Sequence, residues 1–499
     1  MVFAAALSFY SVTLAPTVTW GDSASFSLEA LRGSLQWGGT AGEHPLFLFV
    51  GWMFSALPGE VARNINFEAA VFGALTVMLV YRAGRLLGTS RLAACVGAAA
   101  LCVSHAFWLH SVIAEVYSSN AFFLVAFLNL LLEWRRRASW VWLAGAFVVF
   151  AIGLTNHLVL AAAAPGAVVF LLSTRGRALL TRQSLLIVSV PAAIVVAIVV
   201  AFAVVERGPA AAAFWKLWYG PPGISEYLVP DFAPGPIARE AGYYLAYLIY
   251  QFPSVSLLLG AAGVFALLRD RRPEALLLLL TMALNAAVFI HYTAWRSGSV
   301  GGAKFVFYIT DYVLFSILCA VGTDDLLGRF ANRQPAARRK ILAGVILAAV
   351  ALVPPMVYAA MPSVVTRTGV DLTHARSLPY RDNNRFFLNP NKRGEYGARL
   401  FAQQALQAVR PGAVIFADYT PYAVLRYLQV VEKTRPDVLL RSAAVGQAVP
   451  VRWILDDGRP RPTYLATLTP GYYNLDGLTG EYDLVPTGLI FEVRPGHAR

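Results

Sequence analysis

Long apolar runs recur along the whole sequence, and this pattern limits the possible folds more than any other feature. Of the 499 residues, 58% are hydrophobic and 14% are charged, whereas soluble domains average about 25% charged residues. A membrane-spanning helix needs about 20 apolar residues. We count about eleven runs near that length and predict a polytopic α-helical membrane protein. The predicted spans are 1–18, 65–80, 92–103, 121–132, 140–154, 158–172, 185–205, 252–268, 275–290, 305–321 and 341–360.

Arginine and lysine residues gather in every second loop between these runs. The basic loops contain residues 82–91, 135–137, 175–182, 269–272 and 329–340. The positive-inside rule assigns such loops to the cytoplasm. The amino terminus is therefore predicted to be cytoplasmic, and everything after residue 361 extracytoplasmic. Because the net charge of +13 is spread over these loops, the composition argues against a nucleic-acid-binding surface.

The pattern divides the chain into two parts. Residues 1–361 form a predicted transmembrane module with two large outer loops, 19–62 and 206–250. Residues 362–499 are mixed in composition and contain no cysteine. Helical spacing over 399–409 and short β-type runs at 413–416, 438–440 and 489–493 predict a small extracytoplasmic α/β domain.

The first outer loop concentrates polar groups at the mouth of a span. It carries Asp22, Glu29, Glu43 and His44. Ionisable groups at such a depth are costly and usually functional. Asp22 is the first candidate for a general base, or for a ligand of a phosphate-bound metal. The alternative is that Asp22 caps a helix that starts at Ser23.

Two further groups of polar residues are predicted on the same outer face. Glu115 and Tyr117 can bind a sugar hydroxyl and stack on a sugar ring, or they are a helix-end carboxylate and an interfacial aromatic. Asn156 and His157 join two apolar runs directly, so they line a polar cavity or hydrogen-bond within the bundle.

Arg296 and Lys304 flank a glycine-rich outer stretch, RSGSVGGAK. Basic residues on the outer face depart from the positive-inside pattern. They can bind a lipid phosphate, since arginine offers a bidentate donor fork, or they snorkel to the interface. The P-loop spacing G-x-x-x-x-G-K-[ST] is absent.

Several motifs together resemble one known family. They are TLAPTVTWGDS, EHPLF, AEVYSSNAFF, GLTNHL, DNN…GEYGARLFAQQAL and VIFADYTPYAVLRYLQVVEKTRPDV. They are similar to a membrane family first catalogued as a domain of unknown function, which is related to an animal protein O-mannosyltransferase of the plexin/IPT-domain type. That family is assigned to the GT-C glycosyltransferases. The resemblance implies a GT-C fold, a polyprenyl-phosphate-linked sugar donor and an outer-face active site in which Asp22 is the catalytic acidic residue.

The chain departs from the family pattern at two points. Asp22 is followed by Ser-Ala-Ser-Phe where the family has close to D-S-G-E-F, so a second carboxylate is missing at Ser25. The family's H-P-P-G-Y-P is shortened to the four residues His44 to Phe47. Either Glu29, Glu43 or Glu115 supplies the second carboxylate, or Asp22 alone suffices.

The resemblance leads to a functional expectation with two alternatives. We expect sugar transfer to a protein, lipid or glycan hydroxyl, with inversion at the anomeric carbon, in a prokaryotic inner membrane. Protein O-mannosylation is one form of this reaction. A divalent cation can assist, although no dedicated ligand cluster is present. The alternatives are a transporter or flippase for a lipid-linked solute, and a non-catalytic envelope scaffold.

Overall fold

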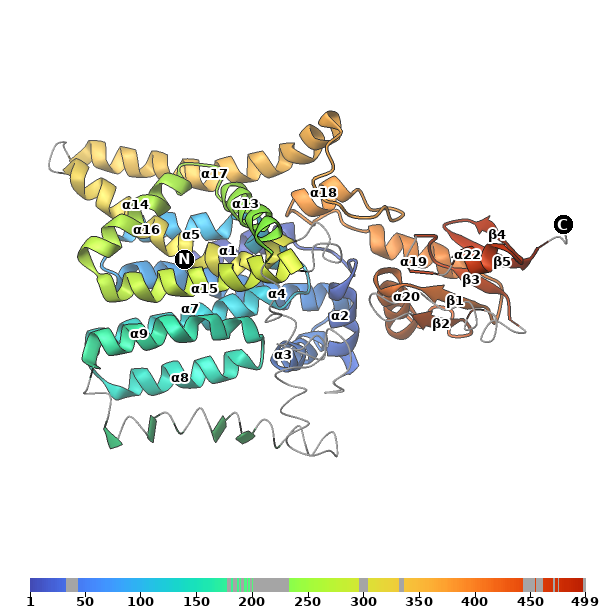
Figure 1. The fold of residues 1–499 in the computed structure, drawn as a ribbon, viewed down its shortest axis with the longest axis horizontal. Helices are drawn as coiled ribbons and strands as arrows, with labels where there is room; N and C mark the ends of the chain where they lie inside the picture. Colours follow the sequence, from blue (N-terminus) through green and yellow to red (C-terminus); the bar gives the residue numbers. More distant parts are fainter. Residues whose placement is uncertain are drawn as a thin grey trace.

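The chain forms a helical bundle followed by a region with a mixed β-sheet (Figure 1). The computed structural model describes residues 1–32, 44–176, 233–295, 304–331, 336–442, 461–469 and 475–496, together with scattered positions between 181 and 200 and with Ile454, Tyr472 and Tyr473. The bundle contains α1 (Val2–Thr13), α2 (Asp22–Arg32), α3 (Pro45–Ser55), α4 (Val61–Leu86), α5 (Arg91–Cys102), α6 (His105–His110), α7 (Tyr117–Arg137), α8 (Trp140–Leu154), α9 (Ala163–Arg175), α13 (Pro234–Gln251), α14 (Ser256–Asp270), α15 (Arg272–Trp295), α16 (Ile309–Ala331) and α17 (Ala336–Thr368). Two 3-10 helices, η2 (Leu158–Ala162) and η4 (Lys304–Tyr308), precede α9 and α16.

The prediction of a polytopic helical membrane protein is confirmed. Among the described residues, five helical stretches are long and apolar enough to cross a membrane, and a sixth arises if the bent pair α13–α14 is one span. Shorter apolar helices are α1, α3, α5 and α8. The predicted span 185–205 lies largely outside the described residues.

One predicted outer loop is partly helical. Residues 234–250, which we assigned to the loop 206–250, belong to α13. The sequence pattern had not indicated this helix. Pro253, just after α13, supplies no backbone N–H, and the chain turns by 110° between α13 and α14.

Glycines bring α14 and α16 into close contact. A Cβ atom at Gly263 would lie 2.0 Å from the Leu318 carbonyl oxygen, and one at Gly322 would lie 1.9 Å from the Leu259 carbonyl oxygen. Small residues permit such backbone approach between helices in membranes. This pair therefore depends on the absence of side chains at both positions.

The charged loops meet at one end of the bundle, which we call the basic end. Arg82 at the end of α4 pairs with Glu133 of α7 at 3.0 Å. Arg135 of α7 pairs with Glu274 of α15 at 2.5 Å. Loops that were predicted to share one side of the membrane therefore lie together, away from the sheet region (Figure 1).

The C-terminal region, residues 397–496, contains a five-stranded sheet. Its strands are β1 (Val414–Ala417), β2 (Leu439–Ser442), β3 (Thr463–Leu465), β4 (Tyr482–Thr487) and β5 (Ile490–Pro495), and its helices are α19 (Gly397–Ala408), α20 (Tyr419–Val431) and α22 (Leu475–Thr479). The strand order is β2-β1-β3-β5-β4. β1 pairs in parallel with β2 and β3, whereas β5 runs antiparallel to β3 and β4.

A connecting segment joins the two parts. Helix α17 extends past the predicted boundary at 361/362 and ends at Thr368. The segment then runs through α18 (Asn383–Leu388) to residue 396. Within it, the backbone N–H of Lys392 donates to the Thr13 carbonyl at 3.0 Å, so the segment contacts the end of α1.

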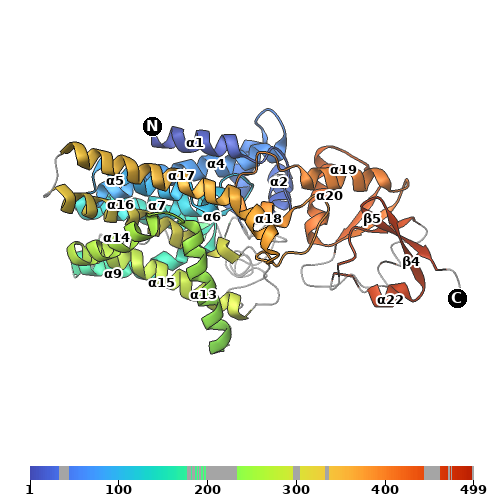
Figure 2. The same ribbon diagram turned by 90° about the horizontal axis from the view of Figure 1, so that it is seen from above.

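The C-terminal region packs on α2 through a shared apolar core (Figure 2). From the bundle this core includes Val18, Trp20, Ala24, Leu28 and Ala62, and from the C-terminal region it includes Phe401, Ala402, Leu425 and Leu428. The Tyr427 hydroxyl adds polar contacts, because it donates to Glu60 at 2.7 Å and accepts from the Ala62 amide at 2.9 Å. The start of α4 and one face of α2 are thus fixed against the C-terminal region.

Candidate active site

Asp22 lies at the junction between the bundle and the C-terminal region. It is the first residue of α2, after Gly21, whose φ of +75° favours glycine. The side chain is half-buried. The Tyr419 hydroxyl, at the start of α20, donates a hydrogen bond of 2.7 Å to Asp22 Oδ1. Among the described residues no helix backbone amide donates to this carboxylate, so the capping alternative is not what the structure has.

Glu115 lies next to Asp22, in the segment between α6 and α7. Burial, the negative charge of Asp22 and the nearby Ser23 hydroxyl all act on Glu115, and the first two raise its pKa well above the ordinary range. Burial also raises the pKa of Asp22, and the Tyr419 hydrogen bond opposes that rise. Two neighbouring carboxyl groups with different proton affinities are a common acid/base arrangement. Here Glu115 is the group that keeps its proton and Asp22 the group that ionises first.

His44 and His157 form a second cluster on the same side. Their ring centroids are 4.8 Å apart. His44 Nδ1 donates to the Asn156 carbonyl at 2.7 Å, and His157 Nδ1 accepts from the Val159 amide at 3.1 Å. Burial lowers the pKa of His44 to about 4 and that of His157 well below its ordinary value, so both rings are neutral at pH 7. His44 Nε2 is then an acceptor and His157 Nε2 a donor.

Tyr117 and Asn156 border this pair of imidazoles. The Tyr117 ring lies 5.7 Å from the His157 ring and 5.2 Å from His110. The buried Asn156 side chain accepts from the Ser119 hydroxyl at 2.9 Å and donates to a backbone carbonyl at 3.3 Å. Its side chain therefore joins the segment after α8 to the start of α7. Its backbone carbonyl orients His44.

Phe26 of α2 links the two clusters. Its ring lies 5.8 Å from His44, and it packs in one small core with Ala114 and Val116, which flank Glu115. The sequence candidates Asp22, Glu115, His44, Tyr117, Asn156 and His157 are thus brought to one side of α2.

The other candidates are placed differently. Glu29 follows Asp22 by seven residues on α2, about 10 Å farther along the helix on the same face. Glu43 and Arg296 lie outside the described residues. Lys304 is nine-tenths buried and its ammonium lies 3.0 Å and 3.1 Å from the two carboxylate oxygens of Glu240 on α13.

Three residues at these sites were missed from the sequence. Tyr419 gave no signal, because the two hydrogen-bonded residues are 397 positions apart. Glu240 lies in a stretch that we had assigned to a loop. No role was predicted for His110, although the pattern HAFWLH places a histidine at each end of α6.

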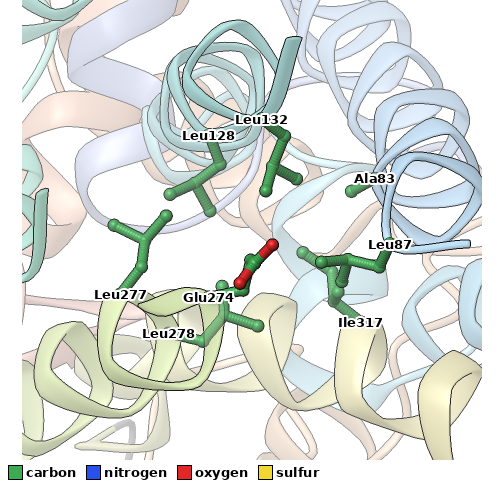
Figure 3. Close-up of a pocket in the computed structure, with 8 residues that line it drawn as sticks. All are labelled: Ala83, Leu87, Leu128, Leu132, Glu274, Leu277, Leu278 and Ile317. Carbon is green, nitrogen blue, oxygen red and sulfur yellow. The ribbon is translucent and has the colours of Figure 1, made fainter. Parts of the chain in front are cut away.

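Neither a metal cluster nor the one described pocket lies at these residues. Among the described residues no group of three or more His, Cys, Asp or Glu side chains could hold a metal. The pocket has a volume of about 10 Å³ and is lined by Ala83, Leu87, Leu128, Leu132, Glu274, Leu277, Leu278 and Ile317. Figure 3 shows the Glu274 carboxylate pointing into it between leucines. Since Glu274 pairs with Arg135, this pocket belongs to the basic end.

Two solved structures resemble the chain in fold. One is ArnT from Cupriavidus metallidurans bound to undecaprenyl phosphate, with a TM-score of 0.55, 15% identity, and coverage of 98% of this chain and 96% of that one. Another is the Archaeoglobus fulgidus oligosaccharyltransferase tethered to an acceptor peptide that contains the NVT sequon, with a TM-score of 0.52 and 11% identity. That match covers 88% of this chain and 63% of the other. Both are GT-C glycosyltransferases.

A family model matches part of the sequence. Residues 33–180 match the protein O-mannosyl-transferase TMEM260 N-terminal domain. The matched stretch contains His44, Glu115 and His157, whereas Asp22 precedes it. No curated protein matches the sequence. The chain therefore has a GT-C-like fold, and its residues 33–180 are similar to the O-mannosyl-transferase family that the sequence motifs had indicated.

Proposed function

We propose that this protein is a membrane glycosyltransferase that moves a sugar from a polyprenyl-phosphate donor to an acceptor hydroxyl. The observation that carries the proposal is the pair of neighbouring carboxyl groups, Asp22 and Glu115, at the end of the bundle opposite the basic end. Such a pair provides one ionised base and one neutral acid in a single site. The GT-C-like fold and the family match support the same class of reaction.

In this mechanism Asp22 removes the proton from the acceptor hydroxyl. The acceptor oxygen forms a bond to the anomeric carbon, and the bond to the lipid phosphate breaks. The phosphate leaves as an anion, so no strong general acid is required. One displacement inverts the anomeric configuration. Glu115, which holds its proton, orients a substrate oxygen and leaves Asp22 as the base.

The histidine cluster fits the sugar of the donor. His44 Nε2 accepts and His157 Nε2 donates, which suits neighbouring sugar hydroxyl groups. Tyr117 offers a ring face beside them. Glu29 and Glu43 remain further candidates for hydroxyl contacts.

Lys304 and Arg296 are proposed to bind the lipid phosphate. Lys304 is paired with the buried carboxylate of Glu240, so a phosphate must share or replace that partner. A chain of ring contacts connects Lys304 to the histidine cluster. The ring of Phe305, the residue after Lys304, lies 6.5 Å from the His110 ring, and the His110 ring packs on Tyr117.

We further propose about eleven membrane spans, in which the shorter apolar helices also cross. The basic end then faces the cytoplasm, and the residue 362–499 domain and Asp22 lie on the outer face of a prokaryotic inner membrane. Undecaprenyl phosphate in ArnT and the acceptor peptide in the oligosaccharyltransferase support a lipid-linked donor and a protein acceptor. Protein O-mannosylation is the most specific form of the proposal.

A reconstituted assay tests this function against its alternatives. Purified protein in liposomes receives polyprenyl-phosphate mannose, labelled in the sugar, and a serine- and threonine-containing peptide. Labelled peptide is the expected product. Movement of the labelled lipid between leaflets without transfer would instead indicate a flippase. If the protein neither transfers the sugar nor moves the lipid, with any of several sugars and acceptors, the scaffold alternative is favoured.

A further inference from the structure

The C-terminal region contributes a hydroxyl group to the candidate active site. The Tyr419 oxygen lies 2.7 Å from Asp22 Oδ1 and 3.1 Å from Ser25 Oγ. In this chain a phenol from another part of the fold thus occupies the space between the two α2 side chains.

The backbone at Tyr419 is held by a buried ion pair. Asp418 is the N-cap of α20, directly before Tyr419. Its carboxylate pairs with both terminal nitrogens of Arg376 from the connecting segment and accepts from the Thr467 hydroxyl at 3.2 Å. The Arg376 guanidinium also stacks on Tyr472 at 4.2 Å. A bidentate pair of this kind fixes orientation as well as distance, so the start of α20 is rigidly placed.

The same interface offers an internal comparison. Tyr427, two turns along α20, makes an equivalent contact, since its hydroxyl donates to the Glu60 carboxylate at 2.7 Å. Both tyrosines anchor the C-terminal region on the bundle through a carboxylate. Only Tyr419 contacts the candidate base.

We propose that Tyr419 is a positioning residue that fixes the Asp22 carboxylate for proton abstraction, so that the active site is completed by the C-terminal region. The catalytic role of Tyr419 in this inference rests on the proposed function. Its geometric content, that the Tyr419 hydroxyl controls the ionisation and orientation of Asp22, can be tested without turnover.

Several neighbouring groups influence the ionisation of Asp22, and the effect of Tyr419 must be distinguished from theirs. Among the described residues, the titratable groups that act on it are Tyr419 from α20 and Glu115 from the segment before α7. Glu68 of α4 lies farther along α2, near Ala30, since a Cβ atom placed on Gly51 would lie 2.9 Å from Glu68 Oε2 and 3.0 Å from the Ala30 Cβ. Because a hydrogen bond to the ionised form favours ionisation, loss of the Tyr419 hydroxyl makes Asp22 harder to ionise.

The experiment compares Tyr419→Phe with Tyr427→Phe in the full-length protein in liposomes. A water-soluble carbodiimide with glycine ethyl ester labels protonated carboxyl groups, and mass spectrometry reports labelling of Asp22 as a function of pH. Tyr419→Phe is expected to move the labelling midpoint upward by about one pH unit. Tyr427→Phe is expected to leave it unchanged. The acidic limb of the transfer rate should shift in the same direction, with about a tenfold loss of kcat below the new midpoint.

Several outcomes would overturn the inference. An unchanged Asp22 midpoint in Tyr419→Phe, or equal shifts in the two variants, would reduce Tyr419 to a structural anchor. If Tyr419→Phe does not fold, Tyr419→Met is measured in its place and must raise the midpoint in the same way, because it also removes the hydroxyl group without adding a charge. A lower midpoint would refute the proposed direction. Failure of the wild-type protein to transfer any sugar would refute the proposed function, yet would leave the labelling result intact.

Discussion

Gly322 of α16 faces the backbone of α14 so closely that an added methyl group has no room. In a Gly322→Ala variant the new Cβ would lie 1.9 Å from the Leu259 carbonyl oxygen and 2.6 Å from the Gly263 nitrogen. Both neighbours are backbone atoms, so a change of side-chain rotamer cannot relieve the contact. The two helices must move apart.

The structure gives the size of this movement. An ordinary contact begins at 3.4 Å, so the helices must separate locally by 3.4 minus 1.9, or about 1.5 Å. A radial gap of 0.5–1 Å already removes about a quarter to a half of a dispersion contact. Overpacking typically costs about 1–3 kcal/mol, and we expect Gly322→Ala to lie near 3 kcal/mol.

Gly328 provides a matched control on the same helix. No atom lies within 4 Å of a Cβ placed there, so Gly328→Ala is expected to stabilise α16 by up to about 1 kcal/mol through helix propensity. Thermal unfolding of the purified proteins in one detergent, followed by tryptophan fluorescence, measures both changes. We expect Gly322→Ala to lower Tm by about 5 °C or more. Equal Tm values for the two variants would refute the close packing of α14 on α16.

Three further changes test other parts of the account. Glu115 has a raised pKa and is active in its protonated form, so the transfer rate should fall as pH rises through that pKa. Glu115→Gln should abolish this alkaline fall in the transfer rate, whereas Glu115→Ala should lose activity. Arg376→Met leaves the Asp418 carboxylate buried without its ion-pair partner and should lower the free energy of unfolding by about 3–5 kcal/mol. The double variant Arg376→Met, Asp418→Asn should recover part of this loss, and thermal unfolding measures both. Burial lowers the pKa of Lys392 to about 7, below its value in the unfolded chain. The unfolded chain therefore binds more protons between about pH 7 and 10, and the free energy of unfolding should rise with pH in this range by up to about 1.4 kcal/mol per pH unit. Lys392→Met should flatten this dependence, whereas Lys433→Met, at an exposed position, should not.

The sequence predicts the bundle well because hydrophobicity is periodic and local. The alternation of basic loops indicated which helix ends lie together, and the ion pairs between α4, α7 and α15 agree with it. Helix 399–409 was also predicted, and it corresponds to α19. The helix over residues 234–250 was not predicted, because a stretch rich in tyrosine and followed by Pro253 resembles an interfacial loop.

The candidate site could be predicted only in part. Asp22, Glu115, His44 and His157 share features that the sequence displays, since each is a polar group at the end of an apolar run. Partners from distant parts of the chain leave no such mark. Tyr419 lies in an ordinary amphipathic helix, and nothing near it in sequence points to Asp22.

The Lys304 interaction shows the same limit. Its basic charge on the outer face was visible in the sequence, and it suggested a phosphate ligand. The buried carboxylate of Glu240, 64 positions earlier, could not be paired with it without the fold. The structure thus adds a partner with which any phosphate must compete.

The most direct test of the central claim is the rate of sugar transfer by Asp22→Asn in liposomes, measured beside wild type and beside Asp476→Asn, an exposed carboxylate on α22. Binding of the polyprenyl-phosphate donor is measured in the same preparations. We predict a loss of kcat of about 100-fold or more for Asp22→Asn, with donor binding retained, and a wild-type rate for Asp476→Asn. A wild-type rate in Asp22→Asn would contradict the assignment of Asp22 as the catalytic base.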